Sequence, residues 1–243
     1  MKPGSYEQHA DQEDRGGGGQ PYPSRRPWVV GVSGASGTPY AAAVLRALLA
    51  AGESVDLVVS RASRLTLLDE TGIAFRDAHW RDDLRSWLAR GADGKPGRFG
   101  PEGLDLDGVR HWAAGDLAAG PSSGSYPVQG MLIVPASTAC VAGVALGLSK
   151  DLLQRAASVT LKERRKLVVA VRETPLDGRT LKHLVALDEA GAVVLPASPA
   201  FYAGATHIQD LVDFVAGRVL DAAGVPHRLY RRWEGELGGS RGD

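Results

Sequence analysis

The sequence predicts an α/β fold of three layers, in which a parallel β-sheet carries helices on both faces. Two observations lead to this prediction. Short apolar segments of strand length alternate along the chain with longer segments of helical composition. The apolar segments are hydrophobic throughout, which is typical of parallel strands that are buried on both faces. Because such sheets bind ligands at the carboxyl ends of their strands, residues that directly follow a strand are the first candidates for function.

Order is expected to begin at Trp28, where the alternation starts. Trp28–Ser33 is an apolar segment that ends in small residues, and it predicts a buried strand. The other expected strands share this character, and they are Ser54–Ser60, Gly130–Pro135, Lys166–Val171 and Ala192–Pro196. The expected helices are rich in Ala and Leu or carry apolar residues on one face, and they are Thr38–Ala50, Arg61–Glu70, a helix from about Thr138, Lys150–Glu163, and the segments 178–189 and 208–223.

Length and composition predict a single domain with flexible ends. The chain has 243 residues, and residues 28–236 are expected to form one domain. Residues 1–27 are rich in Gly, Pro and charged residues, which predicts a flexible tail, and residues 237–243 are expected to be a flexible C-terminus. Residues 81–125 interrupt the alternation. We interpret them as an elaborated connection that contains the loop Gly91–Gly103, with short helices or a strand in its flanks.

Charge and composition exclude several classes of protein. The 28 Lys and Arg balance the 28 Asp and Glu, which argues against a protein that coats nucleic acid or an anionic membrane. The single cysteine, Cys140, excludes an internal disulfide framework, and the six histidines lack metal-ligand spacing, so no metal site is expected. No apolar segment approaches ~20 residues, and the N-terminal residues contain no apolar signal-peptide core. We therefore expect no membrane span and a cytoplasmic location.

The first candidate site is Gly31–Gly37 (GVSGASG), where the first strand meets the first helix. Its small residues let a phosphate approach backbone N–H groups and the positive end of the helix. The glycine spacing differs from both the dinucleotide and the P-loop patterns, and the strand Ser54–Ser60 is not followed by the acidic residue that holds an NAD ribose. We expect a phosphorylated ligand other than NAD. The alternative is a tight turn with a purely structural role.

The second candidate site is the segment Pro135–Cys140 (PASTAC), where another strand gives way to a helix. The hydroxyls of Ser137 and Thr138, together with free N–H groups, suit a phosphate or the carbonyl edge of a ring, whereas a plain N-cap is the alternative. No histidine lies near Cys140 in the sequence to activate its thiol. We interpret Cys140 as a packing residue that makes at most a backbone contact.

The third candidate site is the pair Arg172 and Glu173, which directly follows the apolar strand Lys166–Val171. Both side chains are therefore expected at the ligand-binding edge of the sheet. A carboxylate beside an arginine relays protons or forms an ion pair. The nearby Arg164 and Arg165 are expected to be partly a solvated surface.

Together these motifs resemble the UbiX flavin prenyltransferases, over roughly Trp28 to Trp233. The sequences LKERRKLV, RETP and PAFY are its most specific parts. The segments that carry the resemblance are Gly31–Gly37 (GVSGASG), Ser122–Tyr126 (SSGSY), Leu152–Arg172 (LLQRAASVTLKERRKLVVAVR), Glu173–Pro175 (ETP), Leu195–Tyr202 (LPASPAFY), Arg218 and Arg232-Trp233. The resemblance implies a Rossmann-like or flavodoxin-like fold of three layers, with one flavin-binding domain.

Family members join a dimethylallyl group from dimethylallyl (mono)phosphate to N5 and C6 of reduced FMN, and the product, prenylated FMN, serves a UbiD-type decarboxylase. The resemblance thus implies a metal-independent prenyltransferase with FMN, dimethylallyl phosphate and a UbiD-type decarboxylase as its partners. It also implies a homo-oligomer, which is a dodecamer in the family. The preference for a mono- or a diphosphate donor stays open, as do the roles of residues 1–27 and 91–120.

The resemblance also implies roles for individual residues. The residues expected to hold the flavin are Gly34, Ala35, Ser36, Ser60, Ser137, Thr138, Ala139, Cys140 and Arg172. Those expected to bind the prenyl phosphate are Lys162, Tyr202 and Arg218, with Arg155 as a weaker candidate. Ser36 and Glu173 are expected to handle protons around N5. Lys162 is expected to stabilise the leaving phosphate, and Trp233 to wall the prenyl pocket.

Three positions depart from the family pattern without removing a charged catalytic group. Ala136 stands where the family often has Cys, Cys140 where Thr is frequent, and Ser158 where the family has Asp.

Two alternative functions stay open. One is an FMN-binding decarboxylase-like flavoprotein, but that group uses a histidine after its first helix, and the nearest here is His79. The other is a non-catalytic flavin carrier subunit of a decarboxylase complex, which would not need Lys162, Tyr202 and Arg218 together. An NADP oxidoreductase that uses Arg61 ranks last, because the glycine fingerprint is missing.

Overall fold

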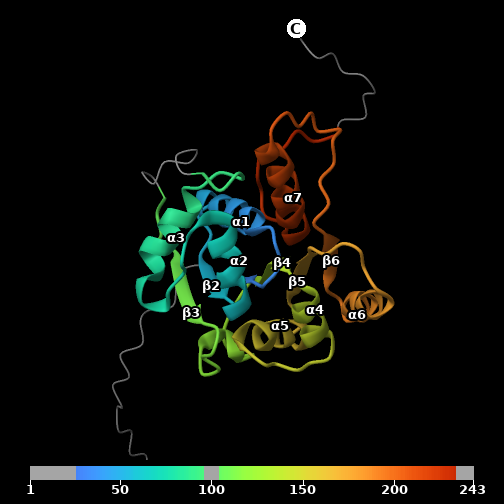
Figure 1. The fold of residues 1–243 in the computed structure, drawn as a ribbon. Coiled ribbons are helices and arrows are strands. Elements are labelled where there is room, and N and C mark those ends of the chain that lie inside the picture. The colour runs from blue at the N-terminus through green and yellow to red at the C-terminus, as the bar shows by residue number, and fades with distance from the viewer. Residues whose placement is uncertain (1–25, 96–103, 234–243) are drawn as a thin grey trace, which may run out of the picture.

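In the computed structural model, which describes residues 26–95 and 104–233, six parallel strands form one sheet in the order β3-β2-β1-β4-β5-β6 (Figure 1). The strands are β1 (Trp28–Val32), β2 (Val55–Val59), β3 (Val109–Ala113), β4 (Gly130–Ala136), β5 (Lys166–Val171) and β6 (Val193–Pro196). This is the order of a doubly wound Rossmann-like sheet, so the predicted fold class is confirmed. The direction of winding reverses between β1 and β4, and ligands of such sheets bind at this reversal.

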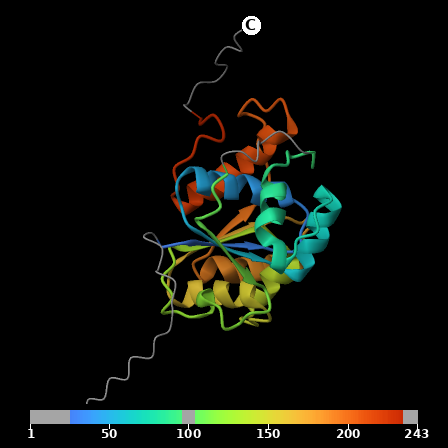
Figure 2. The ribbon, with the colours of Figure 1, turned by 90° about the vertical axis from the view of Figure 1, so that its left-hand side faces the viewer.

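Helices cover both faces of the sheet, and Figure 2 shows the three layers. One face is covered by α1 (Thr38–Ala50), α2 (Arg61–Thr71), α3 (Trp80–Leu88) and α7 (Ile208–Ala223). The other is covered by α4 (Thr138–Ala145), α5 (Leu152–Lys162) and α6 (Gly178–Glu189). Successive strand residues point to opposite faces, so Val30 of β1 packs in the first core and Val29 in the second.

The expected connection at residues 81–125 contains regular structure. Besides most of α3 and the short 3₁₀ helix Gly120–Ser122, it contains β3, an edge strand that the sequence analysis left undecided. The reason is physical. β3 carries Arg110 and His111, both half-buried, so it lacks the continuous apolar pattern of a central strand. The segment Ser122–Tyr126 is anchored to the sheet, since the hydroxyl of Tyr126 donates to the buried Asp56 at 2.9 Å.

The helices that follow β2, β4 and β5 each begin with a side-chain cap. Ser60 accepts a hydrogen bond from the N–H of Ser63, and Ser137 accepts one from Cys140, at the starts of α2 and α4. Asp177 does the same for α6. These caps place the first turns of α2 and α4 beside the ends of β2 and β4, where a ligand of this fold would lie.

The expected flexible ends, residues 1–27 and 237–243, lie outside the described residues apart from Arg26 and Pro27. So do residues 96–103 of the expected loop. Within the described ranges no helix combines the length and apolar character needed to cross a bilayer, and no three His, Cys, Asp or Glu side chains gather in a metal-binding arrangement. The cytoplasmic location and the lack of a metal stay predictions.

Candidate functional site

The turns that follow β1, β4 and β5 meet at the carboxyl edge of the sheet. The hydroxyl of Ser33 donates to the carbonyl oxygen of Pro135 at 2.9 Å and accepts from the N–H of Ser137 at 2.7 Å. The N–H of Arg172 donates to the carbonyl oxygen of Ala136 at 3.1 Å. The structure thus brings the three candidate sites of the sequence analysis to one place.

The turn between β1 and α1 also lies against the start of α2. A Cβ atom on Gly34 would lie 2.5 Å from the Cβ of Ala62, so only glycine permits this approach. The approach brings Gly34, Ala35 and Ser36 next to Ser60, the cap of α2. These four predicted flavin-binding residues therefore lie close together at the carboxyl edge of the sheet.

The N-terminus of α1 is occupied by a side chain of the protein itself. The carboxylate of Glu70 accepts hydrogen bonds from the N–H of Gly37 at 2.9 Å, the N–H of Thr38 at 2.8 Å and the hydroxyl of Thr38 at 2.5 Å. The sequence analysis expected a ligand phosphate at the positive end of this helix. That placement is wrong, because Glu70 already supplies the negative charge.

The N-terminus of α4 is the better place for an anion. Its cap, Ser137, takes the N–H of Cys140, but Thr138 and Ala139 are the first two helical residues, and their N–H groups have no acceptor within the helix. Ala139 is exposed and Thr138 half-buried, so an anion has access to this turn. A phosphate there also gains from the helix dipole.

Cys140 is a packing residue, as expected. Its side chain is buried in the core formed with α5 and α6. Burial raises the pKa of its thiol to about 12, so the nucleophilic thiolate is almost absent at neutral pH. Cys140 therefore contributes its backbone N–H to the first turn of α4 rather than reactive sulfur.

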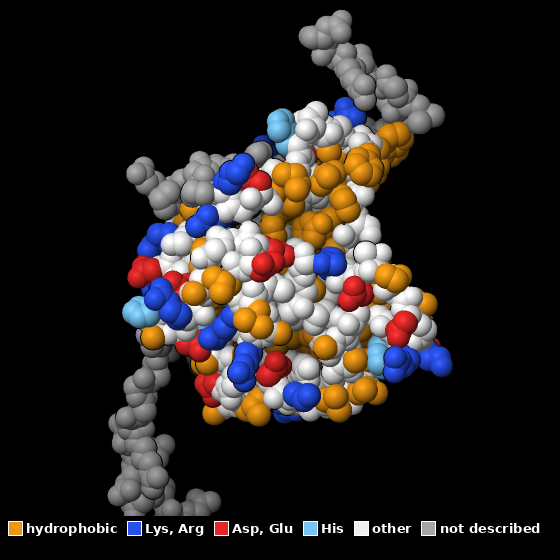
Figure 3. All heavy atoms as spheres, in the orientation of Figure 1, with side chains coloured by type: hydrophobic (Ala, Val, Ile, Leu, Met, Phe, Trp, Pro, Cys, Tyr) orange, Lys and Arg blue, Asp and Glu red, His pale blue; other side chains and the backbone are white. Residues whose placement is uncertain are grey.

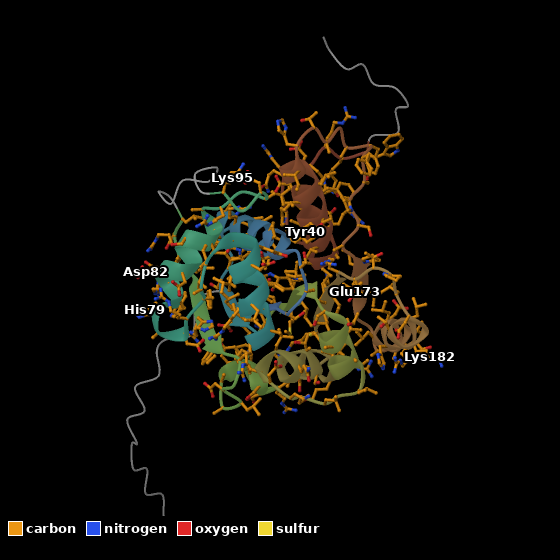
Figure 4. The ribbon with its side chains drawn as sticks, viewed as in Figure 1. Tyr40, His79, Asp82, Lys95, Glu173 and Lys182 are labelled. Carbon is orange, nitrogen blue, oxygen red and sulfur yellow. The ribbon has the colours of Figure 1, made fainter. Side chains whose placement is uncertain are left out.

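Arg172 and Glu173 lie at the edge that the sequence predicted. The Nε of Arg172 donates to the carbonyl oxygen of Ser36 at 3.1 Å, which joins the end of β5 to the first turn. The Glu173 carboxylate is exposed and accepts from the N–H of Thr174 at 3.0 Å. Figure 4 shows Glu173 in the central part of the molecule, below Tyr40, while Lys182 lies at the periphery on α6.

A cavity of about 490 Å³ opens beside these residues. Ser36, Tyr40 and Arg172 line it from the sheet side, and Pro199 and Leu211 line it from the segment before α7 and from α7 itself. Burial raises the pKa of Tyr40, although the nearby Arg172 opposes this shift, so its hydroxyl stays protonated at neutral pH. The volume and the mixed apolar and polar lining suit a planar heterocycle.

Three of the predicted prenyl-phosphate and prenyl-pocket residues gather on and beside α7. The ring of Tyr202 contacts that of Trp233 with centroids 5.8 Å apart, and both side chains are exposed. Arg218 lies on α7 and lines a hollow of about 290 Å³ that also borders β6. Figure 3 shows hydrophobic side chains gathered over the part of the surface formed by α7 and its neighbouring segments.

The remaining two predicted phosphate ligands lie on α5, one near its start and one at its end. Arg155 is near the start of α5, where its Nε donates to the carbonyl oxygen of Ser122. Lys162 ends α5 and pairs with Glu163 at 2.6 Å. The chain enters β5 only four residues later, whereas Glu173 lies just beyond its far end, and six residues of strand span about 20 Å. Within one subunit Lys162 is therefore at the opposite edge of the sheet from Glu173.

Lys162 lies in a basic surface region of its own. Together with Arg164, Arg165 and Glu189 it lines a hollow of about 460 Å³ at the ends of α5 and α6. Arg165 is partly structural, because it donates to the carbonyl oxygens of Gly124 and Tyr126. The sequence analysis expected Arg165 to be only partly a solvated surface, and these two hydrogen bonds agree with that.

Sequence analysis missed two acidic residues of the site. Glu70 lies 33 residues from the turn that it caps, and no local pattern points to that contact. Asp221 pairs with Arg218 at 2.9 Å, and its i,i+3 spacing on a predicted helix was a usable signal. His79, the nearest substitute for a decarboxylase-type base, lies beside α3, far from Glu173 (Figure 4).

Comparison with known proteins shows the family of the chain. The family model described as Flavoprotein matches residues 20–220. The flavin prenyltransferase UbiX of Streptomyces coelicolor is 87% identical over 215 residues, which cover 88% of this chain and 98% of the relative. The flavin prenyltransferase UbiX of Synechocystis is 39% identical over the same shares of the two chains.

Two solved structures are similar over most of the chain. AnUbiX (PadA1), in complex with FMN and dimethylallyl pyrophosphate, has a TM-score of 0.71 and 34% identity, and the match covers 88% of this chain and 100% of that one. The dodecameric FMN-dependent UbiX-like decarboxylase from Escherichia coli O157:H7 has a TM-score of 0.71 and 33% identity, with 86% and 100% covered.

Proposed function

Since the chain belongs to the UbiX flavin prenyltransferases of the flavoprotein family, we propose that it transfers a dimethylallyl group to reduced FMN. In this reaction the C–O bond of dimethylallyl phosphate breaks, and phosphate leaves with the electron pair. New bonds form to N5 and C6 of the flavin in place of two hydrogens, and one proton returns to the five-carbon unit. The product is prenylated FMN. The observation that carries this proposal is the 87% identity to a flavin prenyltransferase over 88% of the chain.

The turns that meet at the carboxyl edge form the proposed flavin site. The first-turn N–H groups of α4 and the hydroxyl of Ser60 would hold the flavin phosphate, because the end of α1 is taken by Glu70. Arg172, which is tied to the carbonyl oxygen of Ser36, would flank the ring system. The 490 Å³ cavity beside Ser36 supplies room for the reacting edge of the ring.

The leaving phosphate needs positive charge, because negative charge develops on it as the C–O bond breaks. Arg218 supplies one guanidinium, and the hydroxyl of Tyr202 lies on the same side of the molecule. Within one subunit Lys162 lies at the opposite edge of the sheet from Glu173. We therefore infer that Lys162 of the partner subunit completes the phosphate site in a homo-oligomer, with Arg155 in a supporting position.

The proton steps belong to Ser36 and Glu173. Both lie at the carboxyl edge, where a carboxylate such as that of Glu173 accepts a proton through a serine hydroxyl. Trp233 and Tyr202 present aromatic rings, whose faces stabilise the positive charge that develops on the allylic fragment. We infer that a UbiD-type decarboxylase accepts the product.

The alternatives have less support. A decarboxylase-type flavoprotein needs a histidine base at the flavin edge, and His79 is remote from it. A non-catalytic flavin carrier does not need the exposed residues Arg218, Tyr202 and Trp233, which lie together on and beside α7. The cytoplasm, with its reducing conditions, is the proposed compartment.

Anaerobic incubation of the chain with reduced FMN and dimethylallyl phosphate, followed by mass spectrometry of the released flavin, tests the proposal. We expect the flavin to gain one five-carbon isoprenyl unit while one phosphate is released per flavin. Glu173→Gln should still bind FMN, yet form product at least ~100-fold more slowly. Unchanged flavin mass with the wild-type chain, under either mono- or diphosphate donor, would refute the proposed activity.

A further inference from the structure

The segment from Val225 to Trp233, here called the C-terminal strap, lies directly on α7. A Cβ atom on Gly217 of α7 would lie 2.6 Å from the ring of Tyr230 and 2.7 Å from that of His227. Glycine at this position therefore allows the strap to approach the helix backbone. Figure 1 shows this last described part of the chain running alongside α7.

One carboxylate, that of Asp221, holds the strap to the helix. It accepts from Tyr230 at 2.5 Å, from Arg232 at 2.7 Å and from His227 at 3.0 Å, all of which belong to the strap. It also accepts from Arg218 of its own helix at 2.9 Å. The N–H of Leu229 donates to Nδ1 of His227, so Nε2 carries the proton that points at Asp221.

Asp221 is ionised at neutral pH. Burial by itself would raise the pKa of its carboxyl, but the hydrogen bonds from Tyr230, Arg232 and His227 outweigh it and lower the pKa to about 2. The side chain is only 16% exposed. The carboxylate of Asp221 is thus a largely shielded anion between the guanidinium groups of Arg218 and Arg232. Its hydrogen bonds limit the orientations that both groups can adopt.

The strap and Arg218 are linked to the proposed prenyl pocket. Nη1 of Arg218 contacts Asp221 and, at 3.4 Å, the hydroxyl of Tyr230, so both of these contacts use a single nitrogen of its planar fork. The strap ends at Trp233, which contacts Tyr202, and Tyr202 in turn contacts Phe214 of α7 with ring centroids 5.7 Å apart. Asp221 therefore contacts both a proposed phosphate ligand, Arg218, and the strap that carries Trp233.

We propose that Asp221 is a positioning residue for the prenyl phosphate, which orients the guanidinium of Arg218 and holds the strap so that Trp233 stands beside Tyr202. This inference rests on the proposed function for the identity of the bound anion. Its geometry, the strap on α7 around one carboxylate, does not depend on that function.

The direction in which phosphate binding changes when Asp221 is removed distinguishes a positioning role from a purely electrostatic one. Asp221 places a negative charge near the proposed phosphate, so on charge alone its removal would strengthen phosphate binding. If Asp221 instead orients Arg218 and the strap, its removal weakens binding, because the guanidinium loses its fixed direction. If Asp221 served only to stabilise the fold, its removal would leave the KM for dimethylallyl phosphate unchanged.

The experiment compares Asp221→Asn with Asp82→Asn, which removes an exposed aspartate of α3 that pairs only at 3.5 Å with Arg85. For Asp221→Asn we expect KM for dimethylallyl phosphate to rise roughly tenfold while kcat changes less than about threefold and the Kd of FMN stays the same. Trypsin should cleave the strap after Arg228 and Arg231 several-fold faster than in wild type. Asp82→Asn should behave as wild type.

An unchanged or lower KM for dimethylallyl phosphate in Asp221→Asn overturns the proposal, and so does unchanged tryptic cleavage of the strap. If that variant does not fold, Tyr230→Phe removes only one hydroxyl, and it should raise the same KM about threefold. If the wild-type chain forms no prenylated flavin, the proposed function fails by itself. Inorganic phosphate then serves as the probe: it should slow strap cleavage in wild type more than in Asp221→Asn, and equal slowing contradicts the positioning role.

Discussion

Glu70 determines which helix end is open to a phosphate. Its carboxylate accepts three hydrogen bonds at the start of α1 and so fills the place that the glycine-rich turn suggested for a ligand. The neighbouring start of α4 has a serine cap and two further N–H groups. The consequence is that the phosphate of the flavin is expected between α4 and α2 rather than on α1.

Replacing Glu70 tests this arrangement. Glu70→Ala removes three hydrogen bonds to a charged acceptor, and we expect the free energy of unfolding to fall by about 2 kcal/mol in urea denaturation of the flavin-free chain. Asp69→Ala, an exposed neighbour on α2, is the control and should change it by less than about 0.5 kcal/mol. Stronger FMN binding by Glu70→Ala would contradict the account, because it would mean that the flavin phosphate binds at α1.

Cys140 offers a second test at the same scale, since it is the single cysteine of the chain. With its pKa raised to about 12, only about one thiol in 10⁴ is a thiolate at pH 8. We expect iodoacetamide to leave the folded protein unlabelled over a period in which the urea-unfolded chain is labelled completely. Cys140→Ala should keep FMN affinity within about threefold, and a complete loss of binding would show that the sulfur has a role of its own.

Individual site residues differed in how far the sequence revealed them. Arg172 and Glu173 were predictable because they directly follow a buried strand, and parallel strands bring such residues to one edge. Glu70 was not, because its contact joins two helices 33 residues apart. Asp221 was partly predictable from helical spacing, but its strap partners depend on how an irregular segment folds back.

At the scale of elements, the proposed flavin site depends on close contact between the β1–α1 turn and the start of α2. Gly34→Ala would place a methyl group 2.5 Å from that of Ala62, so the two elements must separate. We expect this variant to bind FMN at least ~tenfold more weakly in a fluorescence titration. Gly178→Ala at the start of α6, where an added Cβ meets nothing within 4 Å, is the matched control and should bind normally.

If Gly34→Ala and Gly178→Ala bind FMN equally well, the turn is not part of the flavin site. A thermal melt of each variant without FMN distinguishes local displacement from general destabilisation. The account requires weaker binding at a temperature where both variants are folded.

Most elements were predictable because burial on both faces leaves a strong pattern. The helix Thr38–Ala50 and the strand Lys166–Val171 have the predicted bounds, since apolar composition and flanking breakers coincide there. β3 and α3 were not resolved from sequence. β3 is a half-buried edge strand that carries Arg110 and His111, and α3 carries Arg81, Asp82 and Asp83 in its first turns. Elements at the edge of the fold bury less apolar surface, so their sequences need not follow a continuous hydrophobic pattern.

At the scale of the whole molecule, a single subunit does not bring all the proposed residues together. Lys162 and Glu173 lie at opposite edges of the sheet, about the length of β5 apart. No sequence pattern reveals this, because residues supplied by a neighbour leave no mark on the order of elements. A shared site between subunits reconciles the separation with the proposed reaction.

Mixed oligomers test the shared site. Lys162→Ala and Glu173→Gln are each expected to lower product formation at least ~100-fold. In oligomers assembled from equal amounts of both variants, a site needs an intact Lys162 from one subunit and an intact Glu173 from another. Each condition holds in half of the cases, so about a quarter of the wild-type rate should return. No recovery in oligomers that contain both variants would refute the shared site.

The most direct measurement is a crystal structure of the oligomer with FMN and dimethylallyl phosphate bound. The account predicts the flavin phosphate on the first turn of α4, the ring beside Ser36 and Arg172, and the donor phosphate within hydrogen-bond distance of Arg218, Tyr202 and Lys162 of the partner subunit. A donor phosphate bound elsewhere, with Arg218 turned to solvent and Lys162 of the partner subunit out of reach, would contradict it.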